Sequence, residues 1–328
     1  MVTIRDVARR AAVSPSTVSN VLNGRPRASE EVRERVLEAV AALHYTPNPV
    51  ARSLRTRRHG VIALLLPDIT NPFFPEVAKG VEEAADRYGY RVILSSSGGD
   101  AREEQRSVQL IARQVDGIIA VSVLMNATWP ADRHRVKIPV VMVNRRTRRW
   151  EGDFVGIDNR VAAREATGYL IERGHRRIAF IAGSQGSSAS EERRLGYSDA
   201  LAAAGLPRER SLVHRGHLQY EDGEAAVRSF LERSQRPTAI LAADDIMAIG
   251  VLEALDAKGV RVPEDVAVMG FDDIWMSSLR RFQLTTVYQP RYEMGAAAMD
   301  ILVNRIAHPL VPARNILLPH RIVERGTV

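Results

Sequence analysis

The stretch Thr3–Gly24, TIRDVARRAAVSPSTVSNVLNG, holds two short helical patterns separated by a break. Thr3 precedes small and apolar residues that share one helical face, and Asp6 stands three positions after it, the spacing of a capping box. Ser14 then offers a side-chain N-cap for a second helix, with Pro15 at the first helical position, where a missing N–H costs nothing. The sequence therefore predicts two helices joined by a tight turn.

The second helix has an apolar side and a polar side. Val18, Val21 and Leu22 are expected to face inward. The residues left on the outer face are Pro15, Ser16, Thr17, Ser19 and Asn20. A helix-turn-helix presents such a helix to the DNA major groove, although two helices joined by a tight turn also occur in all-α domains that do not bind DNA.

The positive charge is concentrated at the start of the chain. The 328 residues carry a formal net charge of +7. Residues 1–59 contain 11 Arg, no Lys and 5 acidic residues, a net charge of +6, whereas the remainder has 35 basic and 34 acidic residues. A basic head on a nearly neutral body is typical of a nucleic-acid-binding protein; a basic solvated surface is the alternative.

Composition restricts the class of protein. A hydrophobic content of 45% and a charged content of 26% are ordinary for a folded globular protein, and the length allows more than one core. The absence of cysteine excludes disulfides and thiolate metal sites and fits a reducing compartment. The N-terminal MVTIRDVARR lacks the apolar core of a signal peptide, and no run approaches 18 apolar residues. We therefore expect a cytoplasmic protein that does not engage a membrane.

A third helix and a short basic segment follow. Residues 29–44 predict a helix with Ser29 as N-cap, whose buried stripe comprises Val32, Val36, Leu37, Val40 and Leu43. Tyr45–Pro49 ends this helix. Val50–Arg55 is compatible with a helix but too short to hold one alone in water, so it requires a second chain, DNA or both.

Three segments, TIRDVA (3–8), AVSPSTVSNVLNG (12–24) and YTPNPVARSLRTRR (45–58), resemble the DNA-binding head and hinge of the lactose-repressor family, the LacI/GalR-type transcriptional regulators. The resemblance implies a homodimer whose heads bind successive half-sites of a near-palindromic DNA operator, while the hinge helices pair in the minor groove. It also implies that Leu54 is inserted at a central base step, where added contacts offset the cost of unstacking; a linker leucine docked on the body is the alternative. Ala12 stands where the family often has Gly, which costs about 1–2 kcal/mol if that backbone is left-handed.

The resemblance also assigns contacts to DNA. Base edges are expected to be read by Pro15, Ser16 and Asn20, and phosphates to be held by Thr17, Ser19 and Asn23. An asparagine that pairs bidentately with adenine contributes about 1–3 kcal/mol of discrimination. The full set of expected DNA-binding residues is Thr3, Ser14, Pro15, Ser16, Thr17, Ser19, Asn20, Asn23, Asn48, Ala51, Arg52, Leu54 and Arg55.

From Gly60 onward the pattern alternates between strands and helices. Expected strands cover 61–66, 91–95, 117–121, 139–143, 178–182, 238–242 and 266–270. Expected helices cover 75–88, 101–114, 160–173, 191–204, 222–232, 245–258 and 291–307. Repeated βα units predict parallel sheets with helices on both faces, and their number predicts two sheets.

The resemblance implies that this α/β body has the two-lobed periplasmic-binding-protein type I fold. The implied domains are an all-α helix-turn-helix head at 1–46, a hinge at 47–59 and an effector-binding and dimerisation body at 60–328. Lobe 1 is expected at about 60–157 and 290–318, and lobe 2 at about 158–288 and 320–328.

Ligands of such folds bind beyond the carboxyl ends of the strands. The adjacent rings of Phe73 and Phe74 could stack on an apolar sugar face or a base; the alternative is that one ring lies in the core and only the other faces a ligand. The R-x-x-G pattern at Arg193 offers a guanidinium fork for a hydroxyl pair or a carboxylate, while Asp245 is expected to be the N-cap of the next helix. The resemblance completes the expected effector-binding set, Phe73, Phe74, Ser122, Asn144, Arg193, Asp244, Asp272 and Gln289. Many family members have Asp-Arg where Asn144-Arg145 stands, so no particular ligand is transferred.

The sequence disfavours two other classes of protein, an enzyme and an extracellular binding protein. An enzyme is disfavoured because the sequence contains no G-x-x-x-x-G-K-[ST], H-E-x-x-H or G-x-S-x-G, and His175 is expected to be structural. The eight histidines show no metal-ligand spacing, so we expect no catalytic residue, metal or cofactor. An extracellular sugar-transport binding protein would share the body but would need a signal peptide and lack the basic head.

We therefore interpret the sequence as a DNA-binding transcriptional regulator, a repressor controlled by a small-molecule effector. Aromatic, Arg and Asp groups suit a sugar or sugar derivative, and a nucleobase remains an alternative. The sequence leaves open the operator sequence and regulated genes, whether the effector induces or co-represses, and whether the assembly is a dimer or a tetramer.

Overall fold

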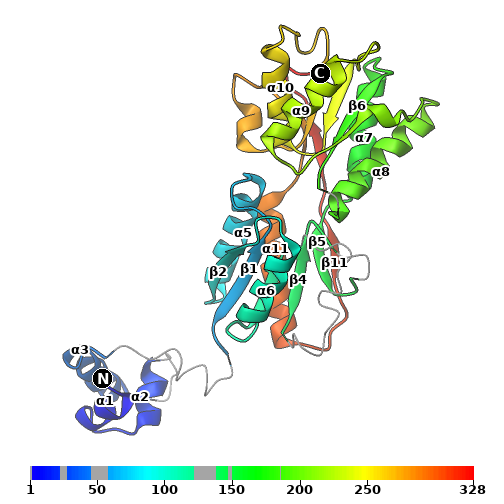
Figure 1. Cartoon of the computed structure of the whole chain (residues 1–328). Coiled ribbons are helices and arrows are strands. Elements are labelled where there is room, and N and C mark those ends of the chain that lie inside the picture. The colour runs from blue at the N-terminus through cyan, green and yellow to red at the C-terminus, as the bar shows by residue number, and fades with distance from the viewer. Residues whose placement is uncertain (1, 23–27, 46–57, 122–137, 147–149, 185) are drawn as a thin grey trace. The chain divides into compact units, whose positions relative to one another are not determined.

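The computed structural model describes residues 2–22, 28–45, 58–121, 138–146, 150–184 and 186–328. They belong to two compact units, Met1–His59, called the head here, and Gly60–Val328, called the body (Figure 1). Among the described residues no helix is long and apolar enough to cross a membrane.

The described residues of the head form a cluster of three helices, α1 (Ile4–Arg10), α2 (Pro15–Leu22) and α3 (Glu30–Ala42) (Figure 1). Each helix contacts the other two. Their small core consists of Val7, Ala8, Ala11, Val18, Val21, Val36 and Ala39. Seven small and medium side chains suffice to bury one side of each helix.

The capping signals in the head are confirmed. The Asp6 carboxylate accepts hydrogen bonds from the Thr3 amide at 3.0 Å and the Thr3 hydroxyl at 2.7 Å. The Ser14 hydroxyl accepts a hydrogen bond from the Thr17 amide at 3.1 Å, so Ser14 caps α2. Ala12 has φ 51°, so the turn between α1 and α2 is left-handed and does carry the alanine penalty of about 1–2 kcal/mol.

Two burial predictions in the head are wrong. Ser19 was expected on the outer face but is only 5% exposed, because α2 contacts both α1 and α3 and is therefore covered on more than one side. Leu37 was expected in the core but is 48% exposed. It lies about 100° around the helix from Val36, which is far enough to leave the buried stripe.

The body contains two six-stranded sheets. The first has the order β11-β5-β4-β3-β1-β2, and its strands pair in parallel. Its strands are β1 (Val61–Leu66), β2 (Arg91–Ser96), β3 (Gly117–Ala120), β4 (Val140–Val143), β5 (Asp153–Gly156) and β11 (Asn315–Leu317). The continuous apolar run of β1 is buried, as expected of a central strand with both faces covered.

The second sheet repeats this order as β12-β10-β9-β8-β6-β7. All of its pairings are parallel except that of β12 with β10, which is antiparallel. Its strands are β6 (Ile178–Ala182), β7 (Val213–Arg215), β8 (Ala239–Ala242), β9 (Ala267–Asp272), β10 (Thr285–Tyr288) and β12 (Arg321–Val323). We call each sheet with its helices a lobe.

The helices of the body are α5 (Phe73–Arg87), α6 (Ala101–Ile111), α7 (Asn159–Glu172), α8 (Ser188–Ala203), α9 (Tyr220–Leu231), α10 (Asp245–Asp256) and α11 (Arg291–Ala307). In the first lobe, α5 and α11 pack together, while α6 contributes Val108 to a separate core cluster that includes Met142 and Phe154 (Figure 1). In the second lobe, α7 packs on α8 and α9 on α10. Helices thus cover both faces of parallel sheets, and the predicted fold class is confirmed.

Glycines set the closest helix contacts. A Cβ on Gly80 of α5 would overlap the carbonyl oxygen of Tyr292 in α11, and a Cβ on Gly196 of α8 would overlap the carbonyl oxygen of Arg160 in α7. Only glycine permits this approach. The helices of each pair therefore touch backbone to backbone.

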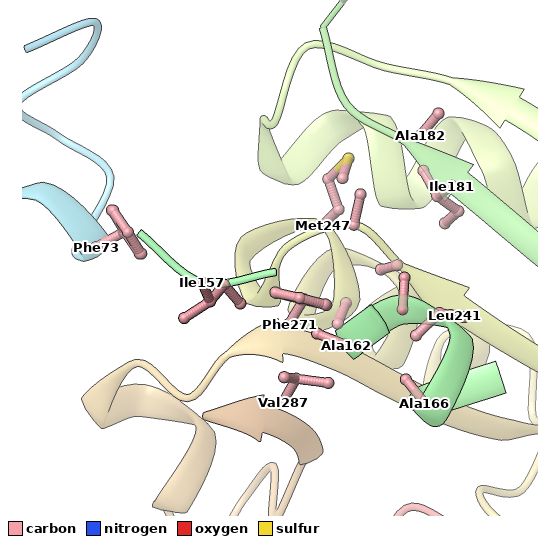
Figure 2. Close-up of a cluster of buried hydrophobic side chains, with 14 of the residues drawn as sticks. Phe73, Ile157, Ala162, Ala166, Ile181, Ala182, Leu241, Met247, Phe271 and Val287 are labelled. Atoms are coloured by element: carbon pink, nitrogen blue, oxygen red, sulfur yellow. The ribbon is translucent and has the colours of Figure 1, made fainter. Parts of the chain in front are cut away.

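The chain passes between the lobes three times, at residues 157–158, 289–290 and 318–320, since the strands and helices on either side belong to different sheets. One hydrophobic cluster continues across this region and includes Phe73, Ile157 and Phe271 (Figure 2). Ile157, in the first crossing segment, therefore belongs to the same hydrophobic cluster as side chains of both lobes.

Candidate functional site

A pocket of about 360 Å³ lies in the body, lined by loops that follow strands of both sheets. Six of the eight predicted effector-binding residues line it: Phe73, Phe74, Asn144, Arg193, Asp244 and Asp272. Ser122 lies outside the described residues. The position of the pocket is the one expected of parallel sheets, because the loops beyond the carboxyl ends of the strands form the crevice where the strand order reverses.

Arg193 is held by the second lobe from several sides. Its Nε donates to Asn159 Oδ1 at 2.8 Å, and its Nη1 donates to the Ala243 carbonyl and lies 3.6 Å from Asp272 Oδ1. Its guanidinium carbon is 3.7 Å from the centroid of the Phe271 ring. The fork is therefore fixed in one orientation before any ligand arrives.

The R-x-x-G pattern has a physical reason. Gly196 lies where α8 touches the backbone of α7, and Arg193 lies on α8 one turn before it. The close approach brings Arg193 within hydrogen-bond distance of Asn159, the first residue of α7. The glycine thus positions the arginine.

Asp244 connects the two lobes. Its Oδ1 accepts from the Met247 amide at 2.9 Å, which makes Asp244 the N-cap of α10. Its Oδ2 accepts from Asn71 Nδ2 at 3.1 Å, and Asn71 Oδ1 in turn accepts from the Phe73 amide at 3.0 Å at the start of α5. One hydrogen bond therefore ties the start of a first-lobe helix to the start of a second-lobe helix.

The prediction that Asp245 is the N-cap of α10 is wrong. The cap is Asp244, and Asp245 is the first residue of the helix. Its buried carboxylate accepts from the Ile274 amide at 2.9 Å, Ser277 Oγ at 2.7 Å and Thr286 Oγ1 at 2.5 Å. These donors come from distant parts of the sequence and turn Asp245 toward the core of the second lobe.

Asp272 is supported by the second crossing. Gln289 does not line the pocket; it is fully buried, and its Nε2 donates to Asp272 Oδ1 at 2.5 Å. Arg291 donates Nη1 to the Asp272 carbonyl and Nε to Glu76 Oε2 at 2.8 Å. Asp272 itself has φ 125°, a strained conformation held by these contacts.

The two phenylalanines do not divide between core and pocket, as the alternative interpretation would require. Phe73 and Phe74 are both buried in the hydrophobic cluster, and both line the pocket. Their rings meet edge to face with centroids 5.2 Å apart. They form an apolar wall on which a sugar face or a ring could stack.

Sequence reasoning missed Asn71, Arg145, Ser187 and Ser190, which also line the pocket. Arg145 follows Asn144, whose φ of 58° is tolerated by asparagine. The Arg145 guanidinium lies 5.9 Å from the centroid of the Phe74 ring. Two sequence signals pointed to Arg145: its place directly after a strand that ends at the crevice, and the Asp-Arg pair that many family members have where Asn144-Arg145 stands.

Burial shifts the pKa values of the charged groups in the pocket. It raises the pKa of the Asp244 carboxyl to about 7. It also raises the pKa of the Asp272 carboxyl, although Arg193 opposes the rise. It lowers the pKa of Arg145 to about 10, and the nearby charge of Arg193 adds to this effect. At neutral pH the Asp244 carboxyl is therefore only partly ionised, while Arg145 keeps its charge.

The predicted DNA-binding residues are placed only in part. Thr3, Ser14, Pro15 and Ser16 are exposed. Thr17 and Asn20 are partly exposed and Ser19 is buried. The remaining predicted residues, Asn23, Asn48, Ala51, Arg52, Leu54 and Arg55, lie outside the described residues.

Metal chemistry has no support in the described part of the chain, where no group of three or more His, Asp or Glu side chains is arranged to hold an ion. His175 lies between α7 and β6, and its Nδ1 is 3.1 Å from Thr238 Oγ1. This contact ties the loop before β6 to the start of β8, which agrees with a structural role.

A helix-turn-helix head on a two-sheet, periplasmic-binding-protein-like body defines a class of bacterial transcription regulators. Residues 3–48 match the family described as bacterial regulatory proteins, lacI family, and residues 167–328 match a periplasmic binding protein-like domain. Catabolite control protein A of Priestia megaterium is 38% identical over 323 residues, which cover 98% of this chain and 97% of that protein. The ribose operon repressor of Haemophilus influenzae is 36% identical over 330 residues, which cover 100% of this chain and 99% of that protein. The chain belongs to the LacI family.

Solved structures agree with this assignment. The complex of the transcriptional regulator CelR with cellobiose has a TM-score of 0.77 at 34% identity and covers 100% of both chains. The Lac repressor dimer bound to operator and the anti-inducer ONPF has a TM-score of 0.89 at 27% identity, covering 99% of this chain and 98% of that chain. These relatives are transcriptional regulators and not enzymes.

Proposed function

We propose that this protein is a cytoplasmic repressor that binds a near-palindromic DNA operator as a homodimer and is regulated by a small molecule bound between its lobes. The observation that carries the proposal is the pocket, in which loops of both sheets bring together buried Arg193, Asp244 and Asp272 beside two aromatic rings. Such a mixture of charged hydrogen-bonding groups and an apolar wall suits a polyhydroxylated ligand.

Each segment of the chain has its own proposed function. Residues 1–46 read DNA, residues 47–59 form the hinge, with Leu54 as the minor-groove wedge, and residues 60–328 bind the effector and the second subunit. Lobe 1 comprises about 60–157 and 290–318, and lobe 2 about 158–288 and 320–328. The separate hydrophobic core of the head supports a reading unit that is distinct from the sensing unit.

Exposed apolar side chains support dimerisation through the body. Ile93 and Leu94, which are 40% and 43% exposed, lie on β2, the edge strand of the first sheet. In the second lobe Trp275 is 60% exposed. A second copy that covers these side chains would remove apolar surface from water, which favours association.

Hydrogen bonds between the lobes can couple ligand binding to DNA binding. The Asn71–Asp244 hydrogen bond and a 3.0 Å hydrogen bond from the Arg146 amide to Ser188 Oγ both join the lobes at the pocket. A ligand that competes for these groups changes the preferred angle between the lobes. In a dimer this alters the hinge spacing, and the coupling free energy expected for such linkage is about 1–3 kcal/mol.

A sugar or sugar derivative is the proposed effector. Relatives named for sugars include the ribose operon repressor and the regulator solved with cellobiose. The chemistry of the pocket agrees, because Asp244 and Asp272 can accept hydrogen bonds from hydroxyl groups and Arg193 can donate to them.

The test begins with the full chain and fragmented genomic DNA of its source. Fragments retained by the protein are sequenced, and we expect them to share an inverted repeat; retention without a shared sequence would contradict specific regulation. Fluorescence anisotropy on that repeat is then measured with sugars, sugar acids and purines that raise the thermal stability of the protein. A ligand that binds the body without changing operator affinity would contradict effector control.

A further inference from the structure

Arg145 is a buried cation with unused hydrogen-bonding capacity. Its side chain lines the pocket, the residue is 6% exposed, and its Nε has no hydrogen-bond partner among the described residues. A buried, unsatisfied charged donor is costly unless something supplies an acceptor. The neighbouring charge of Arg193 adds to the cost of the Arg145 charge, whereas the carboxylates of Asp272, Asp244 and Glu104 reduce it.

The other charged groups of the pocket are already engaged by the protein. Arg193 donates to Asn159 and Ala243, and Asp244 accepts from Met247 and Asn71. Asp272 accepts from Gln289. Among these charged groups the unmet hydrogen-bonding capacity therefore lies on Arg145, and it is that of a donor.

A second feature of the same wall favours negative charge. The 16-residue helix α8 begins at the pocket, where Ser187, its N-cap, and Ser190 are both lining residues. The N-terminus of a helix carries free N–H groups and a partial positive charge. Arg145 and the start of α8 thus present positive potential to the same space.

This corner of the pocket is also open to a larger group. An adjoining cavity of about 730 Å³ is lined by Arg145, Ser187 and Phe74, which line the inner pocket too, and by His217. Arg145 therefore lies where the two spaces meet. A ligand that fills the inner pocket can place a substituent against Arg145 while extending toward the mouth.

We propose that the effector is an anion, a sugar that carries a carboxylate or a phosphate, and that this oxyanion binds Arg145 at the N-terminus of α8. The hydroxyl-bearing part of the ligand then faces Arg193, Asp244 and Asp272. The inference rests on the proposed function in one respect, that the pocket is the effector site. The shared chemistry is an anionic oxygen group, and carboxylate and phosphate are separated by experiment.

The experiment measures binding by calorimetry to the full chain, using matched sets of probes. The sets are glucose, gluconate and glucose 6-phosphate; ribose, ribonate and ribose 5-phosphate; and inorganic phosphate alone. We expect binding by anionic members that R145Q weakens about 10- to 100-fold, the range for a charge-assisted hydrogen bond. R145K retains the charge and should keep part of the affinity. The control R164Q removes one exposed arginine of α7 and should leave binding unchanged.

Folding of R145Q is checked by its melting temperature without ligand, which should equal or exceed that of the wild type because an uncompensated buried charge is removed. Anionic probes that bind wild type and R145Q equally, or a neutral sugar that binds more tightly than both of its anionic derivatives, would overturn the inference. A neutral sugar that changes operator affinity would overturn it and leave the proposed function standing. Arg145-dependent anion binding with no change in operator affinity would leave the inference standing and overturn effector control.

Discussion

Asn71 Nδ2 donates to Asp244 Oδ2 at 3.1 Å, and this single hydrogen bond joins the N-terminus of α5 in the first lobe to the N-terminus of α10 in the second. Both side chains also line the ligand pocket. Occupation of the pocket and the angle between the lobes therefore involve the same two groups.

Asn71→Asp tests this connection. The aspartate keeps an acceptor for the Phe73 amide but places a second carboxylate against Asp244. We expect a loss of about 1–3 kcal/mol in the stability of the body at pH 8, largely recovered at pH 5, where one carboxyl is protonated and can donate. Thermal unfolding at the two pH values measures this, and the control Asn71→Ala, which removes the hydrogen bond without adding a carboxylate, should show a smaller dependence on pH. An equal loss for Asn71→Asp at both pH values would contradict the contact.

The raised pKa of Asp244, about 7, predicts how stability depends on pH. The folded protein holds a proton that the unfolded chain releases near pH 4, so this contribution is fully present below about pH 4 and is lost as pH rises through about 7. The slope from one such group is at most about 1.4 kcal/mol per pH unit. Asp244→Asn should flatten the stability profile between pH 4 and 7 in denaturant titrations. A variant whose profile stays parallel to the wild type would show that Asp244 does not titrate there.

Arg193→Ala is expected to abolish the response of operator binding to the effector, because it removes the fixed guanidinium fork from the pocket. It should also destabilise the body by about 3–5 kcal/mol, since it leaves Asp272 buried without its cation. Operator affinity in the absence of effector should persist at a temperature below the lowered melting point. Anisotropy with and without ligand measures both quantities, and an undiminished response would remove Arg193 from the site.

Substitution of Gly80 by alanine tests the contact between α5 and α11, and substitution of Gly168 by alanine is its control. Gly80→Ala forces a methyl group against the Tyr292 carbonyl and should cost about 1–3 kcal/mol. Gly168→Ala, in α7, adds a methyl group with no atom within 4 Å and should stabilise the protein by about 0.5–1 kcal/mol. Thermal unfolding of both variants measures the two changes in stability. Equal changes would mean that α5 and α11 do not touch as described.

The charge of residues 1–59 predicts the salt dependence of DNA binding. A dimer that places two such heads on DNA and makes 6–10 phosphate contacts should lose about 10³- to 10⁵-fold in affinity between 50 and 200 mM salt. Anisotropy on the retrieved operator at several salt concentrations gives the slope. A flat response would exclude the basic head as the DNA contact.

Much of the pocket could be predicted because parallel βα units leave their functional loops at one edge of each sheet. Asp244 follows the buried strand β8, Asp272 is the last residue of the buried strand β9, and R-x-x-G marks Arg193. Asn71 and Arg145 could not be found in this way, since their roles depend on which way a loop side chain turns. Asp244 and Asp245 are equivalent as caps in sequence, and only the distant Ser277 and Thr286 decide between them.

Five strands of the structure were not predicted from the sequence, and the reason differs from that for the pocket residues. β5, β7, β10, β11 and β12 have three or four residues each, and most include charged or polar side chains. Such short segments lack the apolar run that marks β1, and pairing within an existing sheet supplies their stability.

The last of the three crossings determines the order in which the parts of the protein can fold during synthesis. The first sheet lacks its strand β11 and its helix α11 until residues 291–317 have emerged from the ribosome, and the second lacks β12 until residue 323 has followed. The described core of the head, built from residues up to Tyr45, has no such dependence. During synthesis a DNA-reading unit therefore has all of its core well before the unit that regulates it, and a prematurely terminated chain would keep the former without the latter.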